Sequence, residues 1–163
     1  MSSTRINLSV RATIDGAAPT SGGLLSAVEL SRILGAGTGA DQADTVLHRR
    51  ITLAGGAQAV VDLQADLDPY GVAAGLAEWR IFAIQAAASN GSTVSIAPDG
   101  STPYTGLVGA SGSLPVPAGG VVIMTATGDG QKPITPSAKK LELTNNDGSA
   151  AAVVDVLVVG VSA

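Results

Sequence analysis

The sequence predicts an all-β protein: a β-sandwich, jelly-roll-like, with eight to ten short strands and at most one short helix. Apolar and polar side chains alternate along most segments, which places one set on a buried face of a sheet. Between these segments recur turn-forming residues, with 21 Gly and 8 Pro in 163 residues. Long runs with helical periodicity are absent, so a doubly wound α/β fold is a poor match.

In the first half of the chain, residues 6–14 alternate and predict a strand. Segment 24–34 fits a helix or a strand equally well, and both alternatives stay open. The glycine-rich stretch 35–39 predicts a loop. Residues 45–53 and 57–63 flank a Gly-Gly turn and together predict a hairpin.

In the second half, residues 78–87 form the most apolar strand, and an Asn-Gly pair at 90–91 predicts a hairpin with residues 93–97. Simple alternation assigns the side chains of the first strand to two faces, with Trp79, Ile81 and Ala83 on one and Phe82 and Ile84 on the other.

Residues 98–117 are rich in Gly, Ser and Pro and predict loops with short extended pieces at most. Three further strands are expected at 120–127, 139–144 and 152–161. Neither a repeat nor a linker composition is visible, so we expect one domain over 1–163 with a short N-terminal arm.

The charge balance and composition exclude several classes of function. The formal charge is −4 and the basic residues are scattered, which argues against nucleic-acid binding. The most apolar stretch, 150–163, is shorter than the roughly 18 residues a spanning helix needs and contains Asp155, so we expect no membrane association. The N-terminus lacks the apolar core of a secretory signal, which predicts synthesis in a cytoplasm.

Candidates for catalysis or metal binding are few, and we expect no enzyme activity and no cofactor. The chain has no Cys, and its single His48 lies beside two arginines in a predicted strand. The acidic run Asp62, Asp66 and Asp68 could hold a cation, but it lacks the EF-hand spacing. Asp also favours turns because its side chain accepts nearby backbone N–H groups. We therefore expect no metal site, and cation binding at this turn stays open.

The surface is the informative feature of this composition. Only 13% of the residues are charged and mean hydropathy is +0.36, which would expose apolar patches and sheet edges in a monomer. Permanent subunit contacts bury such patches, so the sequence predicts a homo-oligomeric structural protein.

A series of segments resembles a group of small virion structural proteins of tailed bacteriophages. No single motif is specific, and the ordered series carries the resemblance over about residues 37–161. Its members are Gly-Thr-Gly-Ala-Asp-Gln-Ala-Asp at 37–44, Arg-Ile-Thr-Leu-Ala-Gly-Gly at 50–56, Val-Asp-Leu at 61–63, Asp-Pro-Tyr-Gly at 68–71, Pro-Val-Pro-Ala-Gly-Gly at 115–120, and the apolar close at 141–161.

The resemblance implies a non-enzymatic subunit of the phage particle, a capsid decoration or cement protein more than a tail component. Such a protein, made in the bacterial host cytoplasm, would sit on the outer capsid surface of the virion as a homotrimer bound to the major capsid protein. Residues 98–112 depart from the family pattern because aromatic residues are sparse there.

Exposure and charge nominate residues for contact with the shell or with other subunits. They lie in the N-terminal arm and at four basic positions: Met1, Arg5, Arg49, Arg50, Lys139 and Lys140. The alternative function is an adhesion module of a tail tip or fibre that binds a host surface glycan through the loops around Tyr70 and Tyr104. Trp79 and Phe82 lie in the most apolar strand and are expected in the core.

Overall fold

A computed structural model describes residues 4–13, 25–39, 41–126 and 133–162. The chain divides into two compact units, residues 1–36 and residues 37–163. Every regular element in the described ranges is a strand, as the predicted all-β class requires. That the two units act as one domain stays a prediction.

The first unit contains an antiparallel hairpin of β1 (Thr4–Thr13) and β2 (Leu25–Ala36). Its register runs without interruption from Thr4 opposite Leu34 to Thr13 opposite Leu25. The ambiguous segment 24–34 therefore contributes a strand. Of the expected N-terminal arm, residues 1–3 lie outside the described part, and the rest begins β1.

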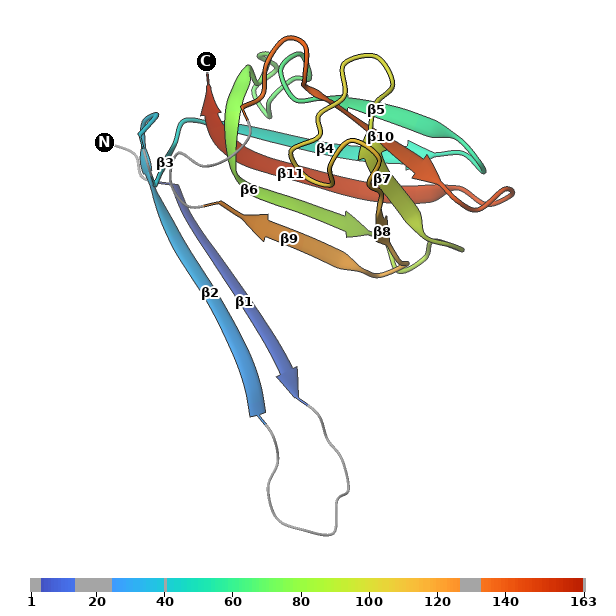
Figure 1. The fold of residues 1–163 in the computed structure, drawn as a ribbon. Coiled ribbons are helices and arrows are strands. Elements are labelled where there is room, and N and C mark those ends of the chain that lie inside the picture. Colours follow the sequence, from blue (N-terminus) through green and yellow to red (C-terminus); the bar gives the residue numbers. More distant parts are fainter. Residues whose placement is uncertain (1–3, 14–24, 40, 127–132, 163) are drawn as a thin grey trace. The chain divides into compact units, whose positions relative to one another are not determined.

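The second unit is a sandwich of two antiparallel sheets with four strands each (Figure 1). Strand order is β4-β11-β6-β9 in one sheet and β5-β10-β7-β8 in the other. Consecutive strands from β4 to β11 lie in opposite sheets, except for β7 and β8, which pair within one sheet, and this order is the jelly-roll topology, as predicted. The strands are β4 (Thr45–Leu53), β5 (Gln58–Asp62), β6 (Leu76–Ala86), β7 (Val94–Pro98), β8 (Leu114–Val116), β9 (Val121–Thr125), β10 (Lys140–Asn145) and β11 (Ala152–Ser162), preceded by the two-residue β3 (Gln42–Ala43).

Both expected hairpins of the second unit are wrong. β4 and β5 belong to different sheets, and so do β6 and β7, so each connection crosses the sandwich. Asn90 is buried and does not form a hairpin turn. Its amide instead accepts the N–H of Val153 at 2.8 Å and donates to the carbonyl of Val153 at 3.0 Å, as a paired strand would.

A second buried amide fixes the other crossing. Asn145 Nδ2 donates to the carbonyl oxygens of Ala150 at 2.8 Å and Ala54 at 3.0 Å. Gly55 lies so close to this connection that a Cβ would stand 2.8 Å from the backbone of Ser149. The Gly-Gly pair therefore allows two loops to approach closely, rather than reversing a strand within one sheet.

The predicted faces of β6 are also wrong in part, because the strand contains a bulge. Val159 pairs with Ile81 and the next residue, Gly160, pairs with Trp79, so Arg80 is an extra residue in β6. The bulge returns Trp79 to the core face with Phe82, where their rings meet edge to face at 6.3 Å. A Cβ on Gly160 would lie 2.0 Å from the carbonyl oxygen of Glu78, so only glycine fits opposite the bulge.

The core lies between the two sheets and is built mainly from aliphatic side chains, with Trp79, Phe82 and Tyr104 among them. Tyr104 lies in the long loop before β8 and is only 1% exposed. Its hydroxyl accepts the indole N–H of Trp79 at 2.8 Å. Burial raises the pKa of Tyr104, against the effect of that hydrogen bond, so the hydroxyl stays neutral.

Candidate interaction surfaces

The described residues do not form an evident catalytic constellation. His48 lies on the exposed outer face of β4, and its Nε2 is 3.8 Å from Asp155 Oδ1. Across the described ranges, no three His, Cys, Asp or Glu side chains are grouped as a metal would require.

The acidic run after β5 is occupied by bonds within the chain. Asp62 Oδ1 accepts the N–H groups of Gln64 and Ala65 at 3.0 Å, and its Oδ2 is 3.3 Å from Lys139 Nζ. Burial would raise the pKa of Asp62, but these two N–H groups and Lys139 outweigh it and lower the pKa. Asp68 Oδ1 accepts the N–H groups of Tyr70 and Val72. The run therefore builds a turn, in agreement with the preference of Asp for turns.

Arg49 and Asp66 seal one free edge of the sandwich. The register of β5 on β10 turns the backbone groups of Val60 and Asp62 away from β10, toward the edge. Arg49 Nη1 donates to the carbonyl of Val60 at 3.2 Å, and Asp66 Oδ2 accepts the N–H of Asp62 at 2.9 Å. The two side chains also pair with each other. We call this arrangement the sealed edge.

The six nominated contact residues do not form one described patch. Arg49 and Lys139 are held by carboxylates at the sealed edge. Arg50 is exposed on the outer face of β4. Lys140 is half-buried at the start of β10; hydrogen bonds from Ser101 lower the pKa of Asp99, and the charge of Lys140 adds to them. The two remaining positions belong to the first unit: Arg5 lies in β1, and Met1 lies outside the described residues.

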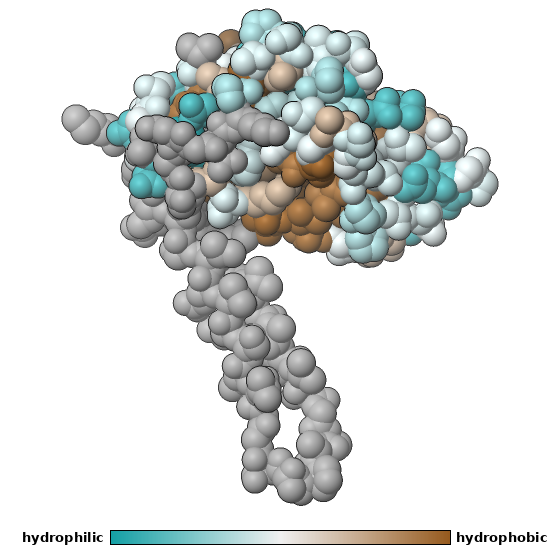
Figure 2. All heavy atoms as spheres, viewed as in Figure 1, coloured by the Kyte–Doolittle hydropathy of each residue, from teal (hydrophilic) through white to brown (hydrophobic). Residues whose placement is uncertain are grey.

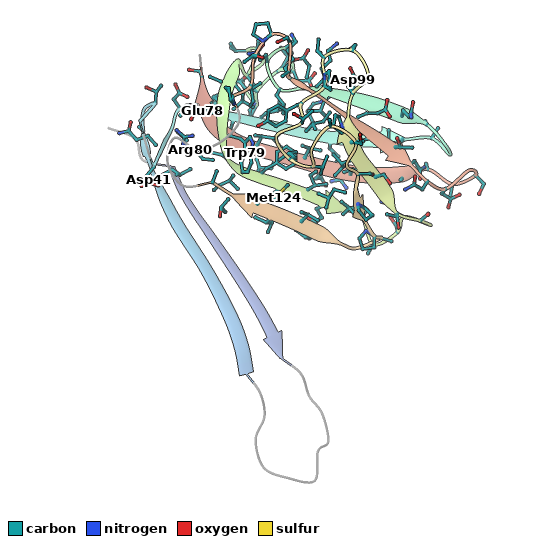
Figure 3. All side chains as sticks on the ribbon, in the orientation of Figure 1. Asp41, Glu78, Trp79, Arg80, Asp99 and Met124 are labelled. Carbon is teal, nitrogen blue, oxygen red and sulfur yellow. The ribbon has the colours of Figure 1, made fainter. Side chains whose placement is uncertain are left out.

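Arg80 is a buried cation that sequence reasoning did not single out. The bulge places it beside Glu78, whose Oε2 is 2.6 Å from Arg80 Nη1 (Figure 3). Arg80 Nη2 lies 3.5 Å from the carbonyl oxygen of Gly39. These contacts hold the bulge and the loop before β3 together, which is a structural role.

An exposed apolar loop follows the sealed edge. We call residues 67–72 the Tyr70 loop, in which Leu67, Tyr70 and Val72 are large exposed side chains and Tyr70 is 91% exposed. The loop is held by Asp68, whose N–H donates to the carbonyl of Val72 at 2.6 Å in addition to its two side-chain bonds. The sequence signal was apolar residues on both sides of an Asp-Pro-Tyr-Gly turn, where polar residues are usual.

At the opposite side of the sandwich, the edge formed by β8 and β9 is apolar. Leu114 on β8 and Val122 and Met124 on β9 pack against the core but stay partly exposed. Figure 2 shows hydrophobic surface gathered beside β9, and Figure 3 marks Met124 on that strand. Val121 is 52% exposed, and residues 117–126 carry no charge. We call the outer side of β9 the bare edge.

Comparison with known proteins gives no assignment: no protein-family model, curated protein or solved structure matches this chain. The described residues also contain no helix long and apolar enough to cross a bilayer.

Proposed function

We propose that the chain is a non-enzymatic virion structural protein, a decoration or cement protein that binds the outside of the assembled phage head as a homo-oligomer, with a trimer favoured. The resemblance over residues 37–161 supports this function, and that range coincides with the sandwich unit. Jelly rolls occur in viral capsid proteins and also in lectins, so the topology agrees with the proposal without selecting it.

The observation that carries the proposal is the Tyr70 loop. Exposed aromatic side chains on a rigid support supply most of the binding energy of many protein interfaces, because little conformational entropy is lost on binding. Asp68 supplies that rigidity through four hydrogen bonds within the loop, two at its carboxylate and two at its backbone. We assign the loop to contact with the major capsid protein.

Stabilisation of the shell then follows from mass action. A protein that binds the assembled shell and not the free capsid subunits lowers the free energy of the assembled state, and each copy that bridges two capsid subunits adds its interface energy. This mechanism uses no cofactor, no metal and no chemical step.

The test mixes purified protein with shells that lack it and measures occupancy by sedimentation and cryo-electron microscopy. We expect ordered density on the outer surface and a loss of affinity of about 30-fold for Tyr70→Ala, the size of a hot-spot truncation. The matched control is Thr52→Ala, also at an exposed position. Bare shells, or equal occupancy for Tyr70→Ala and wild type, would contradict the assignment.

The basic positions are tested in the same assay. Arg50→Ala and Lys140→Ala are the informative variants, because neither residue belongs to the sealed edge. Unchanged occupancy for both would remove them from the shell contact. Arg49→Ala and Lys139→Ala also change internal ion pairs, so their stability must be measured beside their occupancy.

A glycan-binding adhesion module is the second candidate function. The exposed ring of Tyr70 supports it, because such a ring can stack on a sugar. Tyr104, the other nominated aromatic, is buried against Trp79 and offers no such surface. This candidate predicts calorimetric binding of host surface glycans that Tyr70→Ala abolishes, with no binding to shells.

A further inference from the structure

We propose that the bare edge of β9 pairs with the same edge of a second copy, so that the β4-β11-β6-β9 sheets of two copies join into one continuous sheet. This contact does not depend on shell binding, so it stands or fails separately from the proposed function. Backbone hydrogen bonds supply the main attraction in this contact, and the side chains of β9 make it specific.

The free backbone groups of β9 are set by its register on β6. Hydrogen bonds join the N–H of Ala86 to the carbonyl of Gly120 and the N–H of Ala126 to the carbonyl of Arg80, so even-numbered residues of β9 face β6. The N–H and C=O groups of Val121, Ile123 and Thr125 consequently face outward. Within the described ranges no strand pairs with that side of β9.

Two other edge strands of the sandwich, β5 and β8, are protected against such pairing. The β5 edge is capped by Arg49 and Asp66. β8 has Pro115 at its centre, which cannot donate a hydrogen bond. Natural sheets use charges, prolines and covering groups in this way to prevent association between edges. Among the described residues, β9 has none of these protections.

Charge selects a second copy of β9 as the occupant. Each copy carries a net charge of −4, so two copies approach most easily where no charge lies. On β4, self-pairing about Arg50 would bring its exposed cation against its own image, and like charges opposite each other destabilise a sheet. The uncharged run 117–126 imposes no such penalty.

The sequence of β9, Val-Val-Ile-Met-Thr, also fits itself about Ile123. In an antiparallel pair with the two-fold axis at Ile123, that residue meets its own image and Val121 meets Thr125, so all outward backbone groups find partners. On the inner face Val122 meets Met124 of the second copy. The partly exposed apolar side chains of the two bare edges are then buried against each other, which continues the core across the contact.

The contact is isologous and closes at two copies. A trimer of the kind proposed above would use another surface, and both contacts together would give six copies. The assembly therefore contains an even number of protomers in either case, two or six. Removal of the β9 pairing halves this number, to one or three.

Cysteine variants test the two-fold axis directly, because the chain has no cysteine. Hydrogen-bonded partners in an antiparallel pair have Cα atoms about 5.5 Å apart, within the range that a disulfide spans. Ile123→Cys should therefore form an intermolecular disulfide with its own image under mild oxidation by oxidised glutathione. Val121→Cys is the matched control: about 13 Å would separate the two copies of residue 121, too far for a bond.

Light scattering over a dilution series completes the test. Wild type should show the even-numbered species, Val121→Lys should remove it, and Val60→Lys, an equivalent change at a 40% exposed position of the β5 edge, should leave it intact. Circular dichroism of Val121→Lys must match wild type, and Thr125→Lys serves as a second variant if it does not. A wild-type monomer at every concentration, equal crosslinking of Ile123→Cys and Val121→Cys, or unchanged mass for the folded lysine variants would overturn the proposal.

Discussion

The two open sides of the sandwich solve the same physical problem differently. At the sealed edge, the outward carbonyl of Val60 and the outward N–H of Asp62 are bonded to the side chains of Arg49 and Asp66. At the bare edge, Val121 and Ile123 leave the same kinds of groups with no described partner strand. One edge is closed within the chain, and the other is suited to closure by a second chain.

This difference shows how a chain with few charges places them. Among the described basic residues of the sandwich, Arg49, Arg80 and Lys139 are engaged in ion pairs with carboxylates of the same chain, and Arg50 and Lys140 lie on β4 and β10. Residues 117–126, which contain β9, carry no charge. The low charged fraction is therefore concentrated at particular structural positions, while apolar surface stays exposed at the bare edge and the Tyr70 loop.

The largest contrast is expected between truncations at the two edges. Val61 on β5 is fully buried, so Val61→Ala should lower the free energy of unfolding by about 2 to 3 kcal/mol. Met124 on β9 is partly exposed, and Met124→Ala should cost about 1 kcal/mol in dilute protein. Urea denaturation measures both values. Equal losses would mean that the bare edge is as well packed as the sealed one.

A smaller loss is expected when the seal is removed. Arg49→Ala leaves the Val60 carbonyl and the Asp66 carboxylate without their partner, which should cost about 1 to 2 kcal/mol because the site is partly solvated. The variant should also associate more at high concentration, through the uncapped β5 edge. Arg50→Ala, the neighbouring control, should change stability by less than about 0.5 kcal/mol. If the two variants behave alike, the seal contributes nothing.

Low pH should weaken the stabilising interactions of Asp62 beside the sealed edge and leave the uncharged bare edge unaffected. The folded pKa of Asp62 is lowered, so the unfolded chain binds more protons than the folded chain below about pH 4. The stability that Asp62 contributes is present above its unfolded pKa and is lost as pH falls through the folded value. The stability difference between wild type and Asp62→Asn should therefore shrink during an acid titration followed by fluorescence, and a constant difference would contradict this account.

Much of the fold could be predicted from sequence, because alternation and turn residues report directly on strands. The assignment of strands to sheets could not, because Asn-Gly and Gly-Gly pairs do not reveal whether the chain stays in a sheet or crosses to the other. The faces of β6 were missed for a related reason: a single bulged residue, Arg80, reverses the alternation after it. The residue that accommodates this bulge, Gly160, lies on another strand, β11.

The interaction surfaces were less predictable. Arg49 was expected on the surface because charged side chains usually face solvent, yet its length lets it reach from β4 to the backbone of β5. Tyr104 and Tyr70 look equivalent in the sequence, and only the folded chain separates a buried hydroxyl from an exposed ring. The openness of β9 depends on which strand is last in its sheet, and that follows from topology.

Amide hydrogen exchange, followed by NMR at low and high protein concentration, tests the contrast between the two edges most directly. We expect the Asp62 amide to exchange slowly at both concentrations, because Asp66 holds it within the chain. The amides of Val121 and Ile123 should exchange rapidly in dilute protein and slowly in concentrated protein. Rapid exchange of the Asp62 amide in the folded protein, or of the β9 amides at every concentration, would contradict this difference between the two edges.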